Sequence, residues 1–359
     1  MSTYKVETAA LRHNLDCIRK KAGSAVIFAV LKGDGYGLGA ENMAKICIEQ
    51  GVEHFAVTEV SEAGKLRQLG VREILMLRPT ELREELERLI TMDVILTVGS
   101  LDDALTASGI ARELGKKARV HLKIDTGMGR YGFLPDESER LLGCYEHLDT
   151  LDICGIYTHF HSAFCSKKAT RAQLSAFLQV VQDVREAGFE PGMVHCANSS
   201  ALFRLPETVL DAVRVGSAIL GRLSFKTELK KVGYCETAVS HVKWLPKGHT
   251  CGYGAAFTAK KPTRIAILPI GWYHGFTTQY GNDVFRFKDN LRMVLSGLKG
   301  MLKKRSITVT IGKNKCKTLG HVGMLHTVLD VTDKTVSPED VARIEINPLR
   351  VRGMDIEFV

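Results

Sequence analysis

Short apolar segments rich in β-branched residues alternate with longer amphipathic segments through the first 220 residues of this 359-residue chain. The alternation predicts repeated strand–helix units around a parallel sheet. Eight strands are predicted, at residues 25–32, 54–60, 73–79, 93–99, 119–125, 153–160, 192–199 and 212–220. Eight such units in roughly 200 residues match a (β/α)8 barrel of the TIM type. An open doubly wound sheet also fits, but its usual G-x-G-x-x-G signature after the first strand is absent.

The pattern changes after about residue 230. The segments "RIAILPIGWY", "RSITVTIG", "KCKTLGHVGMLHTVLDVT" and "ARIEINPLRVRG" are typical of short strands joined by turns, with little helical periodicity. We therefore expect an α/β chain with two domains. A barrel occupies residues 1–230 and a β-rich domain residues 231–359, with the first few residues able to pair with the β domain.

Composition and charge narrow the function classes. The chain has no apolar leader and no run of 18 uncharged apolar residues, so we expect a cytoplasmic protein with no membrane partner. The nine cysteines are odd in number and form no C-x-x-C pair, which is typical of reduced thiols. The net charge of +9 is dispersed, and its densest cluster, "LKGMLKKRS" at 298–306, has no interleaved aromatic residues. We expect a solvated surface loop there and no nucleic-acid partner. The positive net charge is still compatible with an anionic substrate or cofactor.

Residues at the carboxyl ends of barrel strands face the functional mouth, and here they are polar and varied. Singly, each has an ordinary explanation, such as a surface cation for Lys32 or a helix cap for Arg130. Together they offer an amine for a Schiff base, an arginine for a heterocyclic nitrogen and small residues for a phosphate, the three functions that pyridoxal phosphate (PLP) needs. The collected residues are Lys32, Lys123, Arg130, Tyr157, His159, His161, Asn198, Ser199, Arg214, Gly216 and Ser217.

Five motifs resemble the successive motifs of the alanine racemase family. They are "AVLKGDGYGLG" (29–39), "HLKIDTGMGRYGF" (121–133), "GIYTHFHSA" (155–163), "HCANSSA" (195–201) and "AVRVGSAILG" (212–221). The resemblance runs from residue 4 to about residue 330 in the family's order and spacing. It implies a PLP enzyme with an N-terminal barrel and a C-terminal β domain. The implied activity is that of an isomerase, which racemises a small amino acid, alanine or serine, by removing and returning the Cα proton.

The resemblance also implies residue roles. Lys32 binds PLP covalently and moves the proton on one face of the substrate, while His159 lies against the cofactor ring. Arg214 donates to the pyridine nitrogen, and because arginine keeps its proton, that nitrogen stays unprotonated and simple proton exchange is favoured. The implied phosphate-binding residues are Tyr36, Ser199, Gly216 and Ser217; the implied substrate-carboxylate residue is Arg130, oriented by Lys123, which the family often carries as a carbamate.

The C-terminal half departs from the family pattern. In "PIGWYHGF" (269–276), Trp272 occupies the position of a tyrosine that acts as second base from the other subunit. Indole cannot accept a proton at neutral pH, so Tyr273 or His274 is the candidate base. Strand alternation places Tyr273 on the opposite face from Trp272 unless a bulge or loop intervenes, and His274 on the same face.

Two further departures lie nearby. Leu325 follows the substrate-pocket residue Met324 where an aspartate is usual in the family, and Leu349 aligns loosely with the family's late phosphate-binding tyrosine. A racemase is the leading hypothesis. The alternative is a PLP enzyme of the same fold with another substrate or outcome, or a homologue that lacks two-base activity because of Trp272.

Quaternary structure and metal binding follow from the same motifs. Because the second base and Met324 come from the partner's β domain, the resemblance implies an obligate homodimer with shared active sites. The "THFHS" motif, with Lys123 and His195, also suggests a metal-dependent hydrolase. Those folds carry H-x-H on the first strand rather than the sixth, so we expect no metal.

Overall fold

The computed structural model describes residues 2–278, 287–302 and 307–359. Their contacts divide the chain into two compact units, one formed by Thr8–Val232 and the other by Met1–Glu7 with Gly233–Val359. The sequence placed the boundary after residue 230. Among the described residues, no helix is long and apolar enough to span a bilayer.

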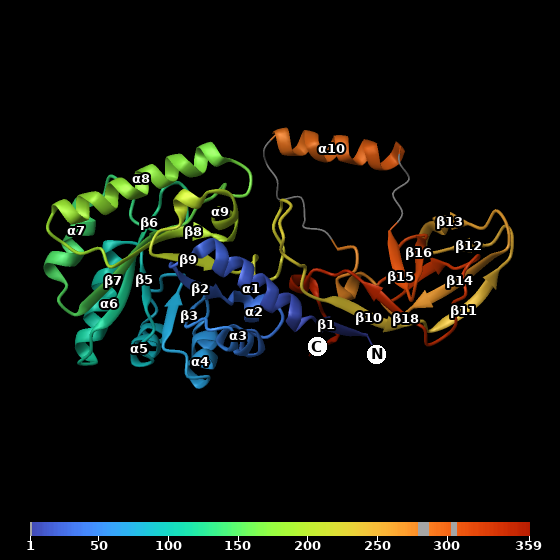
Figure 1. Ribbon diagram of the computed structural model, residues 1–359, viewed down its shortest axis with the longest axis horizontal. Helices are drawn as coiled ribbons and strands as arrows, with labels where there is room; N and C mark the ends of the chain where they lie inside the picture. The colour runs from blue at the N-terminus through green and yellow to red at the C-terminus, as the bar shows by residue number, and fades with distance from the viewer. Residues whose placement is uncertain (1, 279–286, 303–306) are drawn as a thin grey trace. The chain divides into compact units, whose positions relative to one another are not determined.

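Eight parallel strands form the sheet of the first unit (Figure 1), as predicted. Their order is β4-β3-β2-β9-β8-β7-β6-β5, and a parallel bridge between Leu75 and Ile95 joins β4 to β5, so the sheet closes on itself. Inside, strands contribute apolar side chains to one cluster that includes Phe28, Leu75 and Ile95. The strands are β2 (Val26–Val30), β3 (His54–Val57), β4 (Glu73–Met76), β5 (Leu96–Val98), β6 (Ala118–Ile124), β7 (Leu151–Thr158), β8 (Met193–Asn198) and β9 (Ala212–Val215).

Amphipathic helices surround this barrel. The longest, α8, buries Leu174, Phe177, Val181 and Val184 at three- and four-residue spacing, and its first turn is capped by Ser166, whose Oγ accepts from the Ala169 N–H at 3.2 Å. The helices of this unit are α1 (Thr8–Ala22), α2 (Lys32–Tyr36), α3 (Ala40–Glu49), α4 (Val60–Gln68), α5 (Arg83–Thr91), α6 (Leu101–Glu113), α7 (Ser138–His147), α8 (Lys167–Glu186), α9 (Ser199–Arg204) and the 3₁₀ turn η1 (Pro206–Thr208).

The second unit is built on a nine-stranded sheet of order β11-β14-β17-β16-β15-β18-β10-β1-β19. The N-terminal strand β1 pairs with β10 antiparallel and with β19 parallel. Strands occur in all four segments predicted for this half of the chain. The elements are β1 (Thr3–Val6), β10 (Tyr234–Ala238), β11 (His241–Leu245), β12 (Thr250–Cys251), β13 (Phe257–Thr258), β14 (Thr263–Leu268), β15 (Thr308–Ile311), β16 (Asn314–Leu319), β17 (Thr327–Asp330), β18 (Val341–Ile344), β19 (Asp355–Phe358), and the 3₁₀ turns η2 (Tyr253–Ala255), η3 (Trp272–His274) and η4 (Pro348–Arg350).

One helix contradicts the expectation of little helical periodicity after residue 230. Helix α10 (Phe287–Leu302) contains Leu291, Leu295 and Leu298 at helical spacing, a short helical signal between two strand-like segments. The basic cluster at 298–306 was predicted to be a loop, but residues 298–302 belong to α10. Residues 303–306 lie outside the described part of the chain.

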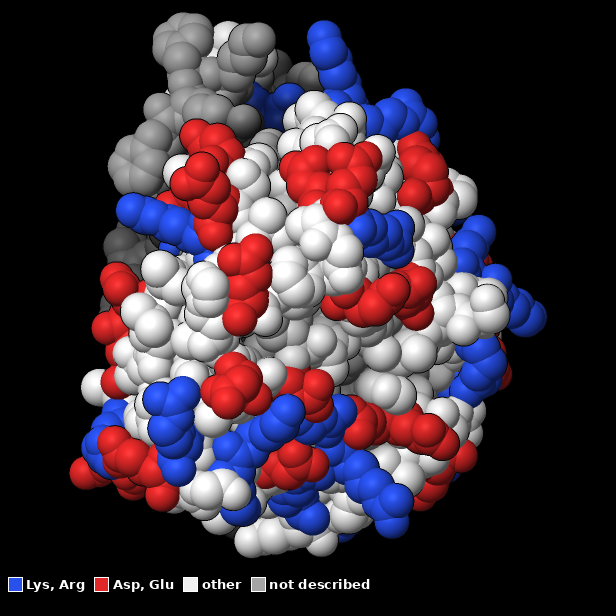
Figure 2. Space-filling view, turned by 90° about the vertical axis from the view of Figure 1, so that its left-hand side faces the viewer, with Lys and Arg blue, Asp and Glu red and all other residues white. Residues whose placement is uncertain are grey.

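Surface charge is mixed on the face of the molecule drawn in Figure 2. Lysine and arginine side chains lie there among aspartate and glutamate side chains rather than in one block. Exposed ion pairs of the first unit include Arg83 with Glu87 and Arg112 with Asp149. An interspersed surface of this kind is typical of solubility rather than of polyanion binding.

Candidate active site

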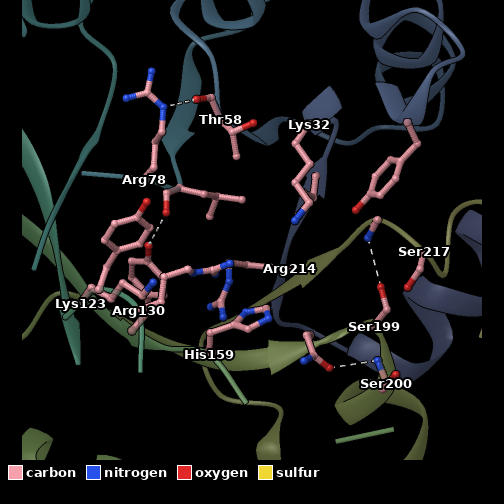
Figure 3. A pocket seen from close by; sticks show the side chains of 17 residues that line it. Lys32, Thr58, Arg78, Lys123, Arg130, His159, Ser199, Ser200, Arg214 and Ser217 are labelled. Atoms are coloured by element: carbon pink, nitrogen blue, oxygen red, sulfur yellow. Dashed lines mark hydrogen bonds between the residues drawn. The ribbon is translucent and has the colours of Figure 1, made fainter. Parts of the chain in front are cut away.

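A cavity of about 390 Å³ opens at the carboxyl ends of the barrel strands (Figure 3). Every barrel residue that was predicted to bind cofactor or substrate lines it. These residues are Lys32, Tyr36, Lys123, Arg130, His159, Ser199, Arg214, Gly216 and Ser217. Because they come from five different strand ends, only the closed barrel brings them together.

The glycine-rich segment after β2 is a left-handed turn. All residues from Gly33 to Gly37 have positive φ, including Asp34 at 50° and Tyr36 at 59°. Each non-glycine residue in this conformation costs roughly 1–2 kcal/mol, so surrounding contacts must maintain the turn. The turn places Lys32 at one end and Tyr36 at the other, and both side chains line the cavity.

Two lysine amines face the cavity without an acidic partner. None of the ion pairs among the described residues involves Lys32, Lys123 or Arg130. Loss of solvation, followed by the charge of Arg130, lowers the pKa of Lys32, and the negative charge of Glu62 opposes part of this shift. Burial, followed by the charges of Arg130 and Arg214, lowers the pKa of Lys123 to about 8. The cavity therefore gathers positive charge that an anionic ligand can neutralise, and its amines release protons more easily than exposed lysines do.

Small residues and hydroxyls form the wall beside β9. Ser199 Oγ accepts hydrogen bonds from the Gly216 N–H (3.1 Å) and the Ala218 N–H (3.2 Å). A Cβ on Gly216 would lie 2.0 Å from the Tyr36 hydroxyl, so this close approach requires glycine. Burial raises the pKa of Tyr36 to about 12, which keeps its hydroxyl protonated and able to donate. This wall can bind phosphate oxygens.

Arg214 is fixed by a buried hydrogen-bond chain. Its Nη1 lies 2.5 Å from His195 Nδ1, and its Nη2 donates to the Thr158 carbonyl at 2.6 Å. Burial and the charge of Arg214 hold the pKa of His195 well below its usual value. A neutral His195 that accepts at Nδ1 carries its proton on Nε2, which lies 3.0 Å from Nδ1 of His121. The guanidinium is thereby oriented without any carboxylate.

His159 is held neutral for a related reason. Burial and the nearby charge of Arg214 lower its pKa to about 3. An uncharged imidazole at the cavity wall can pack against a flat ring without adding another positive charge.

The predicted residues of the second unit gather around η3. The Trp272 N–H donates to the Gly323 carbonyl and the Tyr273 N–H to the Met324 carbonyl, each at 3.1 Å. Trp272 is 48% exposed and Tyr273 42% exposed, whereas His274 is buried and its Nδ1 accepts from the Gly271 N–H at 3.2 Å. The prediction from strand alternation is wrong, because a 3₁₀ turn rotates each residue by about 120°. Trp272 and His274 therefore do not share a face.

The remaining departures are also at the surface of this unit. Met324 and Leu325 line a hollow of about 600 Å³ beside Tyr253 and His326. Leu349, in η4, is 51% exposed. An exposed apolar group of this kind is typical of an interaction surface.

Comparison with known proteins decides the family. The family model "Alanine racemase, N-terminal domain" matches residues 6–224, and "Alanine racemase, C-terminal domain" matches residues 232–348. The chain belongs to the alanine racemase family. This confirms the resemblance drawn from the five motifs.

Individual members of the family agree with this assignment. The alanine racemase of Desulforamulus reducens is 37% identical over 283 residues, which cover 76% of this chain and 76% of that protein. That of Methylacidiphilum infernorum is 31% identical over 336 residues, 92% of this chain and 80% of that protein. The solved alanine racemase of Clostridium difficile 630 has a TM-score of 0.85 at 27% identity and covers all of this chain and 95% of its own.

The family is one of PLP-dependent isomerases, and the residues of the cavity fit that cofactor. The Lys32 amine forms no ion pair among the described residues and can bind the aldehyde carbon of PLP. The space beside Gly216, which a Cβ would fill, can hold the phosphate, and Arg214, oriented by a neutral histidine, can donate to the ring nitrogen. No cluster of three or more metal-ligating side chains occurs in the described parts of the chain. His161 is exposed, and its Nδ1 lies 2.5 Å from Ser162 Oγ.

Sequence reasoning missed several residues that line the cavity, three of them after β3 and β4. Thr58, Leu77 and Arg78 follow β3 and β4, so the strand-end rule applied to those two strands would have found them. Arg78 forms two hydrogen bonds of 2.9 Å with Glu85, and its Nε donates to the Thr58 carbonyl. Its charge is therefore matched, unlike that of Arg130.

A Gly216→Ala variant tests whether the wall beside β9 binds the phosphate of PLP. The new methyl group would displace the Tyr36 hydroxyl, and overpacking of this kind costs roughly 1–3 kcal/mol. We expect the dissociation constant of PLP, measured by titrating the cofactor-free protein, to rise by about tenfold or more. Gly109→Ala is the matched control, because no atom lies within 4 Å of its added Cβ. Unchanged PLP affinity in Gly216→Ala would contradict the assignment of this wall.

Proposed function

We propose that this protein is a PLP-dependent racemase of a small amino acid, with alanine or serine as substrate. The observation that carries the proposal is the single cavity in which the predicted lysine, arginines and phosphate-binding residues converge. None of the cavity side chains Lys32, Lys123 and Arg130 forms an ion pair among the described residues, which suits a ligand set of phosphate and carboxylate groups. Membership of the alanine racemase family supports the same reaction.

The barrel unit binds the cofactor and provides the first of the two acid/base groups. Lys32 binds PLP through its amine, and Tyr36, Ser199, Gly216 and Ser217 hold the phosphate. When bound, PLP supplies an electron-withdrawing ring that acidifies the Cα proton of an amino acid. The Lys32 amine, whose pKa is lowered in this cavity, takes that proton from one enantiomer or returns it.

Arg130 and Arg214 bind different ligands, the substrate and the cofactor. Arg130 binds the substrate carboxylate, and Lys123, at a pKa of about 8, is the site where a carbamate would provide the missing anionic partner. Arg214 donates to the ring nitrogen and keeps its own proton, because a guanidinium is a far stronger base than a pyridine nitrogen or a neutral histidine. A ring nitrogen left unprotonated favours return of the proton to Cα.

Tyr273 is the better candidate for the second acid/base. Its side chain is exposed beside Met324, whereas the His274 ring is buried and already accepts from Gly271. Burial and the charge of His326 also lower the pKa of His274. Tyr273 can donate a proton to, or accept one from, a substrate that reaches it.

A homodimer supplies the second base in this proposal. The β-rich unit exposes three large side chains, Trp272, Tyr273 and Met324. Exposed apolar groups of this kind are typical of a surface that contacts another subunit. We infer that each β-rich unit completes the site of the other subunit, which makes the dimer obligatory. A cytoplasmic location is proposed on the nine free thiols, all of which lie within the described residues.

Proton exchange in D2O tests the function. The purified protein is incubated with individual L-amino acids, and both Cα–H exchange and optical rotation are followed. Exchange with loss of optical activity is expected for alanine or serine. No exchange with any amino acid would defeat the proposal.

A one-base enzyme is the second candidate, favoured by one observation. Trp272 occupies the family's tyrosine position, and indole cannot accept a proton. The same incubation separates the two, since exchange with retention of configuration means that Lys32 acts alone.

A further inference from the structure

A buried carboxylate holds the left-handed turn from the neighbouring helix. Glu62, in the first turn of α4, is only 5% exposed. Its Oε1 accepts a hydrogen bond from the Asp34 N–H at 2.8 Å, and its Oε2 accepts from the N–H groups of Thr58 (3.0 Å) and Glu59 (3.1 Å). One side chain thus joins the turn after β2 to the loop after β3.

The turn depends on such a contact. Its own backbone bonds run from Gly35 to Leu31 and from Gly37 to Gly33, each at 2.9 Å, and leave the Asp34 N–H without a backbone acceptor among the described residues. Asp34 and Tyr36 both have the left-handed conformation that side chains disfavour. Without Glu62, a donor at the centre of the turn would lose its charged acceptor, and the strained residues would be free to relax.

We propose that Glu62 is a positioning residue for cofactor binding. It does not line the cavity. Its hydrogen bond from the Asp34 N–H fixes the turn that delivers the Lys32 amine and the Tyr36 hydroxyl to the same cavity, and its negative charge also acts on that amine, a charge that Glu62→Asp retains. The inference rests on the proposed function, because that function assigns both side chains to PLP.

The test compares Glu62→Gln with wild type in the full-length protein. The amide has one acceptor oxygen, so its NH2 group must face either the Asp34 N–H or the N–H groups of Thr58 and Glu59 in the loop after β3. We expect hydrogen–deuterium exchange of residues 33–37 in the cofactor-free protein to accelerate by about tenfold or more. The dissociation constant of PLP should rise by a similar factor, and the melting temperature of the cofactor-free protein should fall by a few degrees without loss of the fold, because the N–H groups at the start of α4 also lose a charged acceptor.

Lys65→Gln is the matched control. Lys65 pairs with the Asp34 carboxylate at 3.2 Å on the surface of the same turn, where ion pairs contribute little. We expect less than about twofold change in either measurement for this variant. If Glu62→Gln leaves both exchange and PLP affinity at wild-type levels, Glu62 has no positioning role.

Glu62→Asp covers the case in which the amide variant does not fold. It keeps the charge but is one methylene too short to reach both loops, and the same changes are expected. Wild-type exchange and affinity in this variant would equally overturn the proposal. A wild-type protein that binds no PLP would defeat the proposed function instead, while the exchange measurement would still decide whether Glu62 fixes the turn.

Discussion

A Lys32→Ala variant is expected to lose racemase activity by at least about 10³-fold, because both the covalent link to PLP and one proton carrier disappear. The purified variant should lack the absorbance band near 420 nm that borohydride abolishes in a protein with lysine-bound PLP. Racemisation of L-alanine and the absorbance spectrum are the two measurements. The barrel should still fold, since Lys32 follows β2 and forms no ion pair among the described residues.

Lys45→Ala is the control for this experiment. Lys45 is an exposed residue of α3, and its loss should leave spectrum and turnover unchanged. Wild-type absorbance in Lys32→Ala, with reducible PLP still attached, would show that another amine binds the cofactor. Lys123, buried in the same cavity with a pKa of about 8, would then be the residue to examine.

A Tyr273→Phe variant is expected to racemise alanine about 10²- to 10⁴-fold more slowly, which is the usual effect of removing a positioned acid/base. Because Lys32 remains, exchange of the Cα proton of one enantiomer should continue with retention of configuration. The matched control is His274→Asn, whose amide oxygen can still accept from the Gly271 N–H. We expect less than about a threefold change for that control. The opposite ranking would assign the second base to His274.

Mixing the two catalytic variants tests the shared site. If Lys32 and the Tyr273 of the partner subunit form one site, a hybrid of Lys32→Ala and Tyr273→Phe subunits contains one intact site and one doubly altered site. Random exchange of subunits makes about half of the dimers hybrids, so about one quarter of wild-type activity should return. Failure to recover activity under proven subunit exchange would mean that each subunit completes its own site.

The barrel and most of its site residues could be predicted because both follow local rules. Apolar strands that alternate with amphipathic helices predict the (β/α)8 sheet, and the strand-end rule assigns Lys32, Lys123 and Arg214 to its mouth. The same rule would have added Thr58 and Arg78. Motifs as far apart in the sequence as those of Lys32 and Arg214 indicate one cofactor, because strand order in a closed barrel determines which strand ends converge.

The local conformation of the functional turns could not be predicted in this way. The glycines around Tyr36 are compatible with many turns, and the left-handed one depends on Glu62, a residue of another strand–helix unit. At Trp272 the alternation rule failed because η3 interrupts the strand pattern, with its backbone bonded to the loop at Met324. Long-range hydrogen bonds of this kind leave no periodic signal in the sequence.

The sequence by itself determined the fold, the cofactor and the residues that meet at the barrel mouth, since hydrophobic periodicity and side-chain chemistry are local properties. Only the tertiary structure decided how those residues are held. It showed that Arg214 is oriented by the neutral pair His195 and His121 and that a strained left-handed turn begins directly after Lys32. It also showed that Tyr273 rather than His274 is exposed. These outcomes depend on contacts between distant segments, which form only when the chain has folded.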